Sequence, residues 1–320
     1  MSRQQSSKSI LMVEPTHFES NAQAINDNTF MNKPEESIDV HKMGVQEFTR
    51  YYEALIEKGV NVKLFQPRGD GIETPDCLFP NNWFSTHSVE EMSNVNGCSG
   101  GKNTLVLYPM CHPNRRLERR SNIIEYLKSR HSEDLLDIID LTHYENENKF
   151  LEGTGSFVLD RVNKNAYICI SQRSNKELAQ EWCDKLGYNL ISFQSLDSND
   201  KIVYHTNVIM AIGTKIAVIC LDSIPNPQER ELVQSTLSKT HTIIDISKDQ
   251  VNNFCGNVIE VQNEKGDQFL VCSKSSFDAF TDSQKDIISK NCNGGFITRE
   301  IPTIQSVGGG GIRCMIAELN

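Results

Sequence analysis

Cys314 is the residue whose surroundings most clearly indicate chemistry. It follows four consecutive glycines in the segment SVGGGGIRC, residues 306–314. Glycines adopt backbone conformations closed to other residues, and they let a ligand approach the main chain closely. We expect a strand over 311–319, with the cysteine at its start and at the mouth of the glycine loop. Most cysteines of soluble proteins are buried apolar residues, but this setting favours a nucleophilic thiol.

Two further polar residues each stand directly before an expected strand. His205 lies in YHTN ahead of the apolar run 208–212, where a histidine can serve as a general acid or base. Glu152 lies in LEGTGS, and its neighbouring glycines leave room for a ligand. Seven other histidines compete with His205, and Glu152 could equally be a solvent-facing loop carboxylate. Spacing alone therefore makes both residues candidates without assigning either a role.

The segment 75–84, PDCLFPNNWF, is rich in side chains that bind and orient ligands. Asp76 can accept hydrogen bonds, and Asn82 can both donate and accept them. Phe79 and Trp83 can stack on a planar group, although core packing is the ordinary role for at least one of them. We expect this segment to line a binding pocket.

The composition excludes several classes of protein. Apolar residues make up 38% and charged residues 23%, as in soluble globular enzymes. The formal net charge of −10 disfavours binding to nucleic acid. No apolar run is long enough to span a membrane or to form a secretory signal. We expect a cytoplasmic protein, with a short mitochondrial presequence at residues 1–9 as the alternative, because Arg3 and Lys8 stand there without an acid.

Cysteine spacing gives no sign of a metal site. The ten cysteines include no Cys-x-x-Cys pair, which zinc sites and thioredoxin-like centres usually contain. We therefore expect free thiols in a reducing compartment, no metal and no cofactor.

The chain repeats a pattern of two strands, a helix and a strand five times. This regular pair of strands before each helix argues against an open doubly wound sheet. We expect one domain over 1–320, a closed ring with a flexible tail at 1–9, in which the last strand completes the first unit. The expected ranges are 10–13, 39–58, 60–66 with 311–319; 82–87, 104–108, 114–130, 136–141; 156–160, 166–171, 175–186, 189–193; 207–212, 216–221, 227–238, 242–246; and 257–261, 268–273, 281–290, 296–300.

The four boxes PNNWFSTH, LEGTGS, YHTN and GGGGIRC, in this order, resemble those of arginine deiminase relatives. The chain looks most similar to the amidinotransferase-related or citrulline hydrolase branch of the pentein, or guanidine-modifying, superfamily. The resemblance spans nearly the whole chain and implies a five-bladed α/β propeller, in agreement with the repeat count.

The resemblance also implies roles for individual residues. Cys314 matches the nucleophile, His205 the general acid/base and Glu152 the carboxylate that holds a substrate nitrogen. Arg173, in SQRS, matches an arginine that binds the substrate α-carboxylate, which suits its bidentate fork. Phe79 and Asn82 match the loop that lines the guanidinium pocket. The implied reaction passes through a covalent adduct on the thiol and releases ammonia.

Two positions depart from the arginine deiminase pattern. Asn207 and Asn82 stand where those enzymes have aspartates, so two charge-assisted contacts to a guanidinium are missing. We therefore expect a neutral ureido substrate, citrulline or a relative, in preference to arginine. The alternatives are an amidinotransferase, a dimethylarginine hydrolase, or a catalytically silent pentein acting as a structural subunit. The oligomeric state stays open, and a homo-oligomer is compatible with the sequence.

Overall fold

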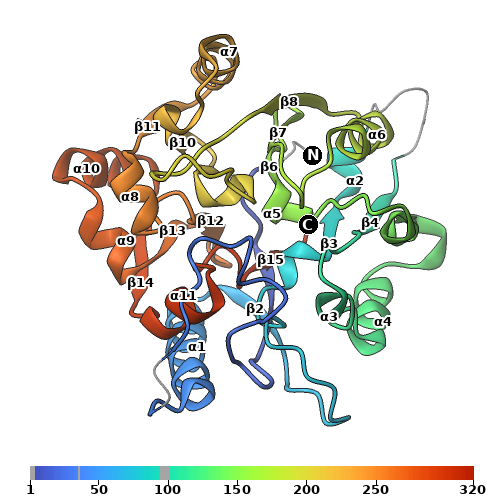
Figure 1. The fold of residues 1–320 in the computed structure, drawn as a ribbon. Coiled ribbons are helices and arrows are strands. Elements are labelled where there is room, and N and C mark those ends of the chain that lie inside the picture. The colour runs from blue at the N-terminus through green and yellow to red at the C-terminus, as the bar shows by residue number, and fades with distance from the viewer. Residues whose placement is uncertain (1–3, 35–36, 94–100) are drawn as a thin grey trace.

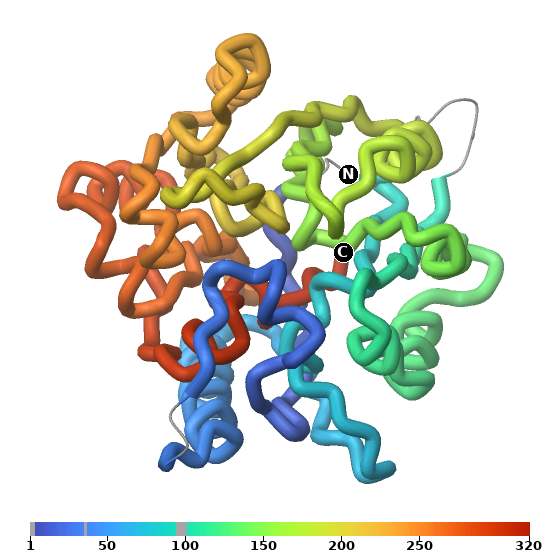
Figure 2. The backbone as a smooth tube through the Cα atoms, viewed as in Figure 1, coloured from blue at the N-terminus to red at the C-terminus, as the bar shows by residue number. Residues whose placement is uncertain are grey.

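Five three-stranded sheets surround a central axis in the computed structural model, which describes residues 4–34, 37–93 and 101–320. Figures 1 and 2 show the sheets as blades that follow one another around the ring in chain order. The predicted five-bladed α/β propeller is confirmed.

The blades have the strand orders β15-β1-β2, β3-β4-β5, β6-β7-β8, β9-β10-β11 and β12-β13-β14. The strands are β1 Ser9–Val13, β2 Asn61–Phe65, β3 Phe84–His87, β4 Asn103–Leu107, β5 Leu136–Asp140, β6 Phe157–Asp160, β7 Asn165–Cys169, β8 Asn189–Phe193, β9 Met210–Ile212, β10 Ile216–Ile219, β11 Thr242–Asp245, β12 Ile259–Gln262, β13 Gln268–Ser273, β14 Gly295–Arg299 and β15 Ala317–Glu318.

Each blade pairs its first two strands antiparallel and its last two parallel. In the blade β9-β10-β11, for example, Val218 of β10 faces Ala211 on one side and Ile244 on the other. A parallel pair needs a crossover, which a helix provides. The middle strand is covered on both faces, so all four residues of β10 are apolar and buried.

Five helices provide these crossovers: α1 Val40–Glu57, α4 Ser121–Ser129, α6 Lys176–Leu186, α7 Pro227–Leu237 and α10 Asp282–Asn291. Local sequence fixes their ends. Asn175 caps the start of α6 by accepting from the Leu178 amide, and Gly187 ends it in the left-handed conformation with φ of 68°. Three shorter helices connect successive blades, α5 Gly153–Ser156, α8 Lys248–Asn252 and α11 Pro302–Gly308, and three lie within a blade, α2 Val89–Met92, α3 Pro113–Arg116 and α9 Lys274–Ala279.

The two ends of the chain close the ring. Strand β15 pairs antiparallel with β1, with Ile10 opposite Glu318 and Leu11 opposite Ala317. The red and dark blue segments accordingly lie side by side near the centre of Figure 2. The expectation that the last strand completes the first blade is confirmed.

The expected flexible tail at 1–9 is wrong for residues 5–9. Gln5, Ser6 and Ser7 are buried, and β1 already begins at Ser9. The Gln5 side chain donates to the carbonyls of Leu159 (2.8 Å) and Ile212 (3.2 Å). These carbonyls belong to β6 and β9, so the N-terminal segment joins two neighbouring blades. Residues 1–3 lie outside the described part of the chain.

Other differences from the expected elements occur near the axis. Most of the expected strand 311–319 is a series of turns, in which the Cys314 amide donates to the Gly311 carbonyl at 3.2 Å. The expected helix 114–130 is split into α3 and α4. The split points Arg115 and Glu118 into the protein interior, where they form a buried ion pair that an exposed helix could not hold.

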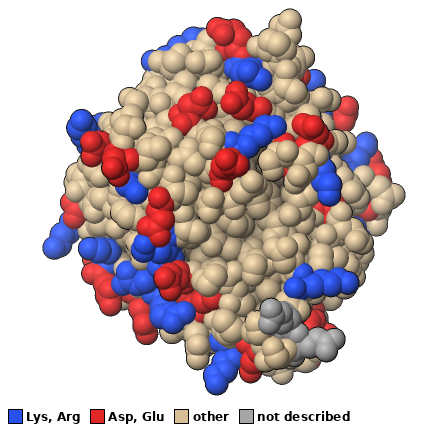
Figure 3. All heavy atoms as spheres, turned by 60° about the vertical axis from the view of Figure 1, so that its left-hand side comes forward, with Lys and Arg blue, Asp and Glu red and all other residues tan. Residues whose placement is uncertain are grey.

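Acidic and basic side chains are interspersed on the face shown in Figure 3, so this face offers no continuous basic patch. Within the described residues, no helix is both long enough and apolar enough to cross a bilayer.

Candidate active site

Each blade places a polar residue just before its first strand, and these positions converge at the axis. Asn82 precedes β3, Glu152 precedes α5 and β6, His205 precedes β9, Asn257 precedes β12 and Cys314 precedes β15. The same position, just before the first strand, therefore recurs in each blade, while the residue type at that position differs from blade to blade. All five side chains are buried, with at most 4% of their surface exposed.

His205 and Glu152 form a direct pair. His205 Nε2 lies 2.8 Å from Glu152 Oε2. An ionised carboxylate only accepts hydrogen bonds, so Nε2 carries the hydrogen and Nδ1 of the neutral ring keeps its lone pair. Among the described residues Nδ1 has no hydrogen-bond partner, and His205 lines the axial cavity. The imidazole is thus held in a tautomer whose basic nitrogen is free.

Glu152 is fixed on its other side as well. The Cys111 amide donates to its Oε1 at 2.9 Å, and guanidinium nitrogens of Arg173 and Arg115 lie 3.7 and 3.9 Å from Oε2. Burial opposes ionisation of Glu152, but Arg173, His205 and Arg115 outweigh it and hold its pKa well below the usual range. Glu152 is therefore a permanent carboxylate at neutral pH.

Amide groups surround the sulfur of Cys314. Nδ2 of Asn257 lies 3.3 Å and Nδ2 of Asn207 lies 3.7 Å from Sγ, and the Asn257 oxygen lies 3.6 Å away. The Asn257 side chain can thus accept from a thiol or donate to a thiolate. Burial raises the pKa of Cys314, while Asn257, the charge of Arg313 and Asn207 oppose that rise. Burial lowers the pKa of His205, so thiol and imidazole are both neutral in the empty site.

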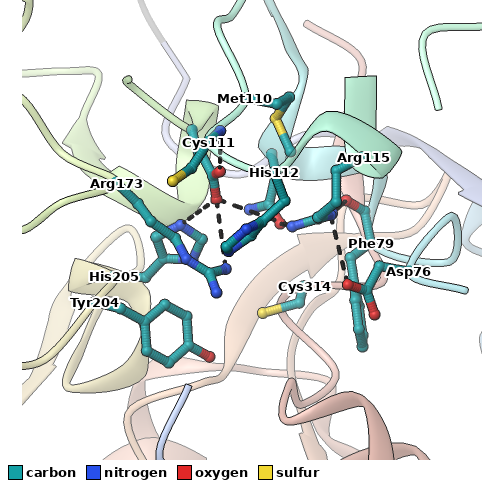
Figure 4. Close-up of polar contacts among 12 residues, drawn as sticks. Asp76, Phe79, Met110, Cys111, His112, Arg115, Arg173, Tyr204, His205 and Cys314 are labelled. Atoms are coloured by element: carbon teal, nitrogen blue, oxygen red, sulfur yellow. Dashed lines mark hydrogen bonds and ion pairs between the residues drawn. The ribbon is translucent and has the colours of Figure 1, made fainter. Parts of the chain in front are cut away.

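One cavity brings these groups together, as Figure 4 shows for Cys314, His205 and their neighbours. Its walls include Asp76, Phe79, Asn82, Arg115, Arg173, Tyr204, His205, Gly308–Gly310 and Cys314. The glycine loop is packed against Phe79, because a Cβ at Gly308 or Gly310 would lie 2.9 or 3.0 Å from its ring. A side chain at either position would crowd the ring, which explains why these two residues are glycines.

Arg115 and Glu118 form a second charged group in the cavity wall. Arg115 Nε and Nη2 donate to the two Glu118 oxygens at 2.8 and 3.0 Å, and Arg115 Nη1 donates to Asn82 Oδ1 at 2.9 Å. Burial raises the pKa of Glu118 to about 7, against the lowering effect of Arg115. Asp76 Oδ2 lies 3.7 Å from Arg115 and accepts from Asn21 at 2.6 Å, whereas Oδ1 has no partner.

Arg173 points into the cavity and holds a carboxylate of the protein. Its Nε and Nη2 donate to Asp27 at 3.0 and 2.5 Å, and its guanidinium lies 4.9 Å from the Tyr204 ring. Burial opposes ionisation of Asp27, but His112 and Arg173 lower its pKa to about 2. The bidentate fork of Arg173 is therefore oriented to bind a carboxylate at the cavity.

Asp27, Cys111 and His112 offer donor atoms within 4.8 Å of one another, the one such group of three found among the described residues. His112 Nε2 lies 3.3 Å from Asp27 but makes no well-oriented hydrogen bond. These donor types suit zinc. However, Asp27 already has the Arg173 cation as its partner, so a metal would compete with an existing ion pair.

All eight residues predicted for the site lie in or against this cavity: Cys314, His205, Glu152, Phe79, Asn82, Asn207, Arg173 and Asp76. Sequence reasoning missed Asn257, Arg115, Glu118 and Asp27. Asn257 could have been found, because it stands two residues before β12 as Asn82 stands two before β3. Nothing in the sequence distinguishes Arg115 from the other basic residues of its segment.

Several solved structures share this fold. ArgZ, an arginine dihydrolase from the ornithine-ammonia cycle in cyanobacteria, matches with a TM-score of 0.68 and 18% identity over 98% of this chain. This chain spans only 40% of the length of that protein. AgrE, as a mutant in complex with L-arginine, matches with a TM-score of 0.68, 17% identity and coverage of 98% of this chain and 40% of AgrE.

A dimethylarginine dimethylaminohydrolase variant, as an adduct with S-methyl-L-thiocitrulline, matches with a TM-score of 0.62 and 16% identity. That match covers 97% of this chain and 99% of the other. No curated protein shows significant sequence similarity to the chain.

A family model described as N,N dimethylarginine dimethylhydrolase, eukaryotic, matches residues 14–320. The predicted pentein superfamily is therefore correct, and the matching family model is that of the dimethylarginine hydrolases. Dimethylarginine hydrolysis, which stood among the alternatives, gains support over the ureido preference. The chain belongs to the eukaryotic N,N-dimethylarginine dimethylhydrolase family.

Proposed function

We propose that residues 1–320 act as one catalytic domain, a cysteine-dependent hydrolase that cleaves a C–N bond at the terminal carbon of an arginine-derived amino acid. The observation that carries the proposal is the meeting of Cys314, His205 and Glu152 around one buried cavity from three different blades. A thiol, a base with a free nitrogen and a carboxylate that orients the base are the parts of nucleophilic catalysis.

In the first step, Nδ1 of His205 accepts the thiol proton as the sulfur of Cys314 attacks the trigonal carbon of the substrate. As the C–S bond forms, the π electron pair of the C=O or C=N bond moves onto the oxygen or nitrogen atom. When the pair returns, the C–N bond to the terminal amine breaks, and the amine leaves with the proton from His205. Glu152 stabilises the imidazolium between these events through its contact to Nε2.

In the second step, the neutral imidazole accepts a proton from water, whose oxygen attacks the carbon of the adduct. The C–S bond then breaks and the thiol is restored with the proton from His205. These steps use only residues of this chain, and the fork of Arg173 holds the substrate α-carboxylate in place of Asp27.

Family membership makes N,N-dimethylarginine the first candidate substrate. Attack at its guanidino carbon would release dimethylamine, and hydrolysis of the adduct would give citrulline. The pocket must then accept the two methyl groups beside His205.

The charges of the pocket support citrulline as a second candidate. Glu118 and Glu152 already face protein cations, and Arg115 and Arg173 place two positive charges beside the cavity. A guanidinium would enter a site whose carboxylates are mostly paired, whereas a ureido group brings no charge. Citrulline would release ammonia, and hydrolysis of its adduct would give ornithine and carbon dioxide.

Initial rates with N,N-dimethylarginine, arginine and citrulline test the proposal, with dimethylamine, ammonia and ornithine as products to be measured. Acid quenching during turnover, followed by mass spectrometry of the peptide that contains Cys314, should reveal the adduct. The proposal is wrong if none of the three substrates is consumed, or if an adduct forms on a different residue.

A further inference from the structure

The orientation of the Asn82 amide is fixed by its neighbour. Arg115 Nη1 lies 2.9 Å from Asn82 Oδ1. A guanidinium has five N–H donors and no acceptor, so only the amide oxygen can face it. The amide nitrogen must then point the other way, where Asn82 Nδ2 is buried and has no hydrogen-bond partner. An unpaired buried donor is energetically unfavourable, and a ligand that accepts its hydrogen bond would remove that cost.

Arg115 cannot turn away to release this amide. Both Glu118 oxygens hold it, the Phe79 carbonyl accepts from its Nη2 at 3.4 Å, and only 3% of its surface is exposed. Rotating the Asn82 amide by half a turn would set its N–H groups against the guanidinium. Glu118 thus holds Arg115, and Arg115 holds the amide orientation of Asn82; we call this pair of side chains the clamp.

The free amide nitrogen lies beside the reacting groups. Asn82, His205 and Cys314 line the same cavity. A Cβ at Gly155 would lie 2.3 Å from Asn82 Nδ2 and 2.7 Å from His205 Nδ1, so both nitrogens pack against the face of Gly155 where a side chain would otherwise stand, and they are near neighbours. A substrate carbon placed between Cys314 and His205 would bring one of its substituents to Asn82.

We infer that Arg115 is a specificity-determining positioning residue, which makes Asn82 a hydrogen-bond donor to an oxygen on the reacting carbon and so selects ureido over guanidino substrates. This inference rests on the hydrolase function proposed above and favours citrulline, the second candidate substrate, over N,N-dimethylarginine. A ureido group has a carbonyl oxygen to accept the Asn82 N–H. A protonated guanidino group, methylated or not, has only donors and would face Asn82 donor against donor.

The same contact helps the reaction itself. When Cys314 attacks a ureido carbon, the C–S bond forms and the carbonyl electron pair moves onto the oxygen. A donor already aimed at that oxygen stabilises the developing negative charge. Asp76 Oδ1, which also lacks a partner, can accept an N–H from either kind of substrate and does not discriminate between them.

The sharpest test is Asn82→Asp, because it replaces the cavity-facing N–H₂ with an acceptor while Arg115 keeps an oxygen partner. We expect the ratio of kcat/KM for citrulline to kcat/KM for arginine to fall by about a hundredfold or more. Asn226→Asp is the matched control, since Asn226 only caps α7 and aspartate caps equally well. The control should leave the ratio unchanged.

Removing the clamp should have the same direction of effect without adding a charge to the pocket. The double variant Arg115→Gln with Glu118→Gln leaves the Asn82 amide free to turn. The ratio of kcat/KM for citrulline to kcat/KM for arginine should therefore fall, because the amide can then present its oxygen to arginine. Calorimetric binding of citrulline and arginine to the Cys314→Ser form of each variant provides a readout that does not need turnover.

An unchanged ratio of rates and of affinities in Asn82→Asp would overturn the inference while leaving the hydrolase function intact. A wild-type protein that hydrolyses N,N-dimethylarginine faster than citrulline would overturn it as well. Failure of the proposed function has a different signature, because no substrate would be consumed although citrulline could still bind.

Discussion

Among the described residues two histidine–glutamate pairs are buried, and only one of these histidines lines the cavity that contains Cys314. In the blade β3-β4-β5, His87 Nδ1 lies 2.6 Å from Glu91 Oε1. At the axis, His205 Nε2 lies 2.8 Å from Glu152 Oε2. In both pairs burial lowers the histidine pKa, and nearby cations hold the glutamate pKa well below its usual range.

The two pairs differ in what the second histidine nitrogen meets. His87 Nε2 lies 2.8 Å from Ser85 Oγ, which in turn contacts the Tyr108 hydroxyl at 2.7 Å. Glu91 is likewise enclosed by Arg161 at 2.8 Å and by the Tyr188 hydroxyl. His205 Nδ1 instead opens to the cavity of Cys314. Residue type and perturbed pKa are thus shared, and unused hydrogen-bonding capacity beside a thiol distinguishes the reactive pair.

The largest expected effect comes from removing the thiol. Cys314→Ala should lower kcat by at least about 10⁴-fold, because no other group in the cavity can form the covalent adduct. Steady-state rates with the best substrate measure it. The control Cys183→Ala removes a buried thiol outside the cavity and should keep a kcat near that of the wild type. Equal losses of kcat in the two variants would contradict the assignment of Cys314 as the nucleophile.

Glu152→Gln should reduce kcat by about 10²- to 10⁴-fold, since the imidazolium loses its counter-charge. The change should also shift the pH profile. His205 must be neutral to accept a proton, so activity falls as the pH drops through its pKa, below 6.5. Glu152 raises that pKa against burial, so the acidic limb of kcat/KM should move to lower pH in the variant. An unmoved limb would show that His205 is not the titrating base.

Glu91→Gln should act on stability and not on the pH profile. Removing one partner of a buried ion pair leaves Arg161 poorly compensated and costs about 3–5 kcal/mol. The remaining Glu318 contact at 3.7 Å makes the low end of that range the expected value. Denaturant unfolding measures the loss, and the fraction that stays folded should keep the wild-type pH dependence. If the acidic limb of the kcat/KM profile shifted in Glu91→Gln, the pair of His87 and Glu91 would also influence catalysis, and the distinction between the two pairs would be wrong.

The smallest effect is expected for Ser85→Ala. This change leaves His87 Nε2 and the Tyr108 hydroxyl each without one partner, at a cost of about 1–3 kcal/mol. The free energy of unfolding should fall while kcat is unchanged. A loss of activity larger than the loss of folded protein would mean that the Glu91 pair also takes part in catalysis.

Local sequence was enough to predict the repeat and much of the site. Strand and helix periodicity gave five units and a closing strand, because burial on a sheet or helix face imposes its period on the chain. The glycines before Cys314 and the polar residues just before strands pointed to the axis. Local sequence was misleading for 311–319, where an apolar strand-like run forms turns.

The tertiary structure alone decided which of these residues touch. The contact between His205 and Glu152, the amides around Cys314 and the clamp of Arg115 on Asn82 each join different blades or distant segments. Sequence determined the kinds of side chain available, because periodicity and capping act between near neighbours. The donor and acceptor pattern of the cavity depends on distances of about 3 Å between segments far apart in the chain, and only closure of the ring sets those distances.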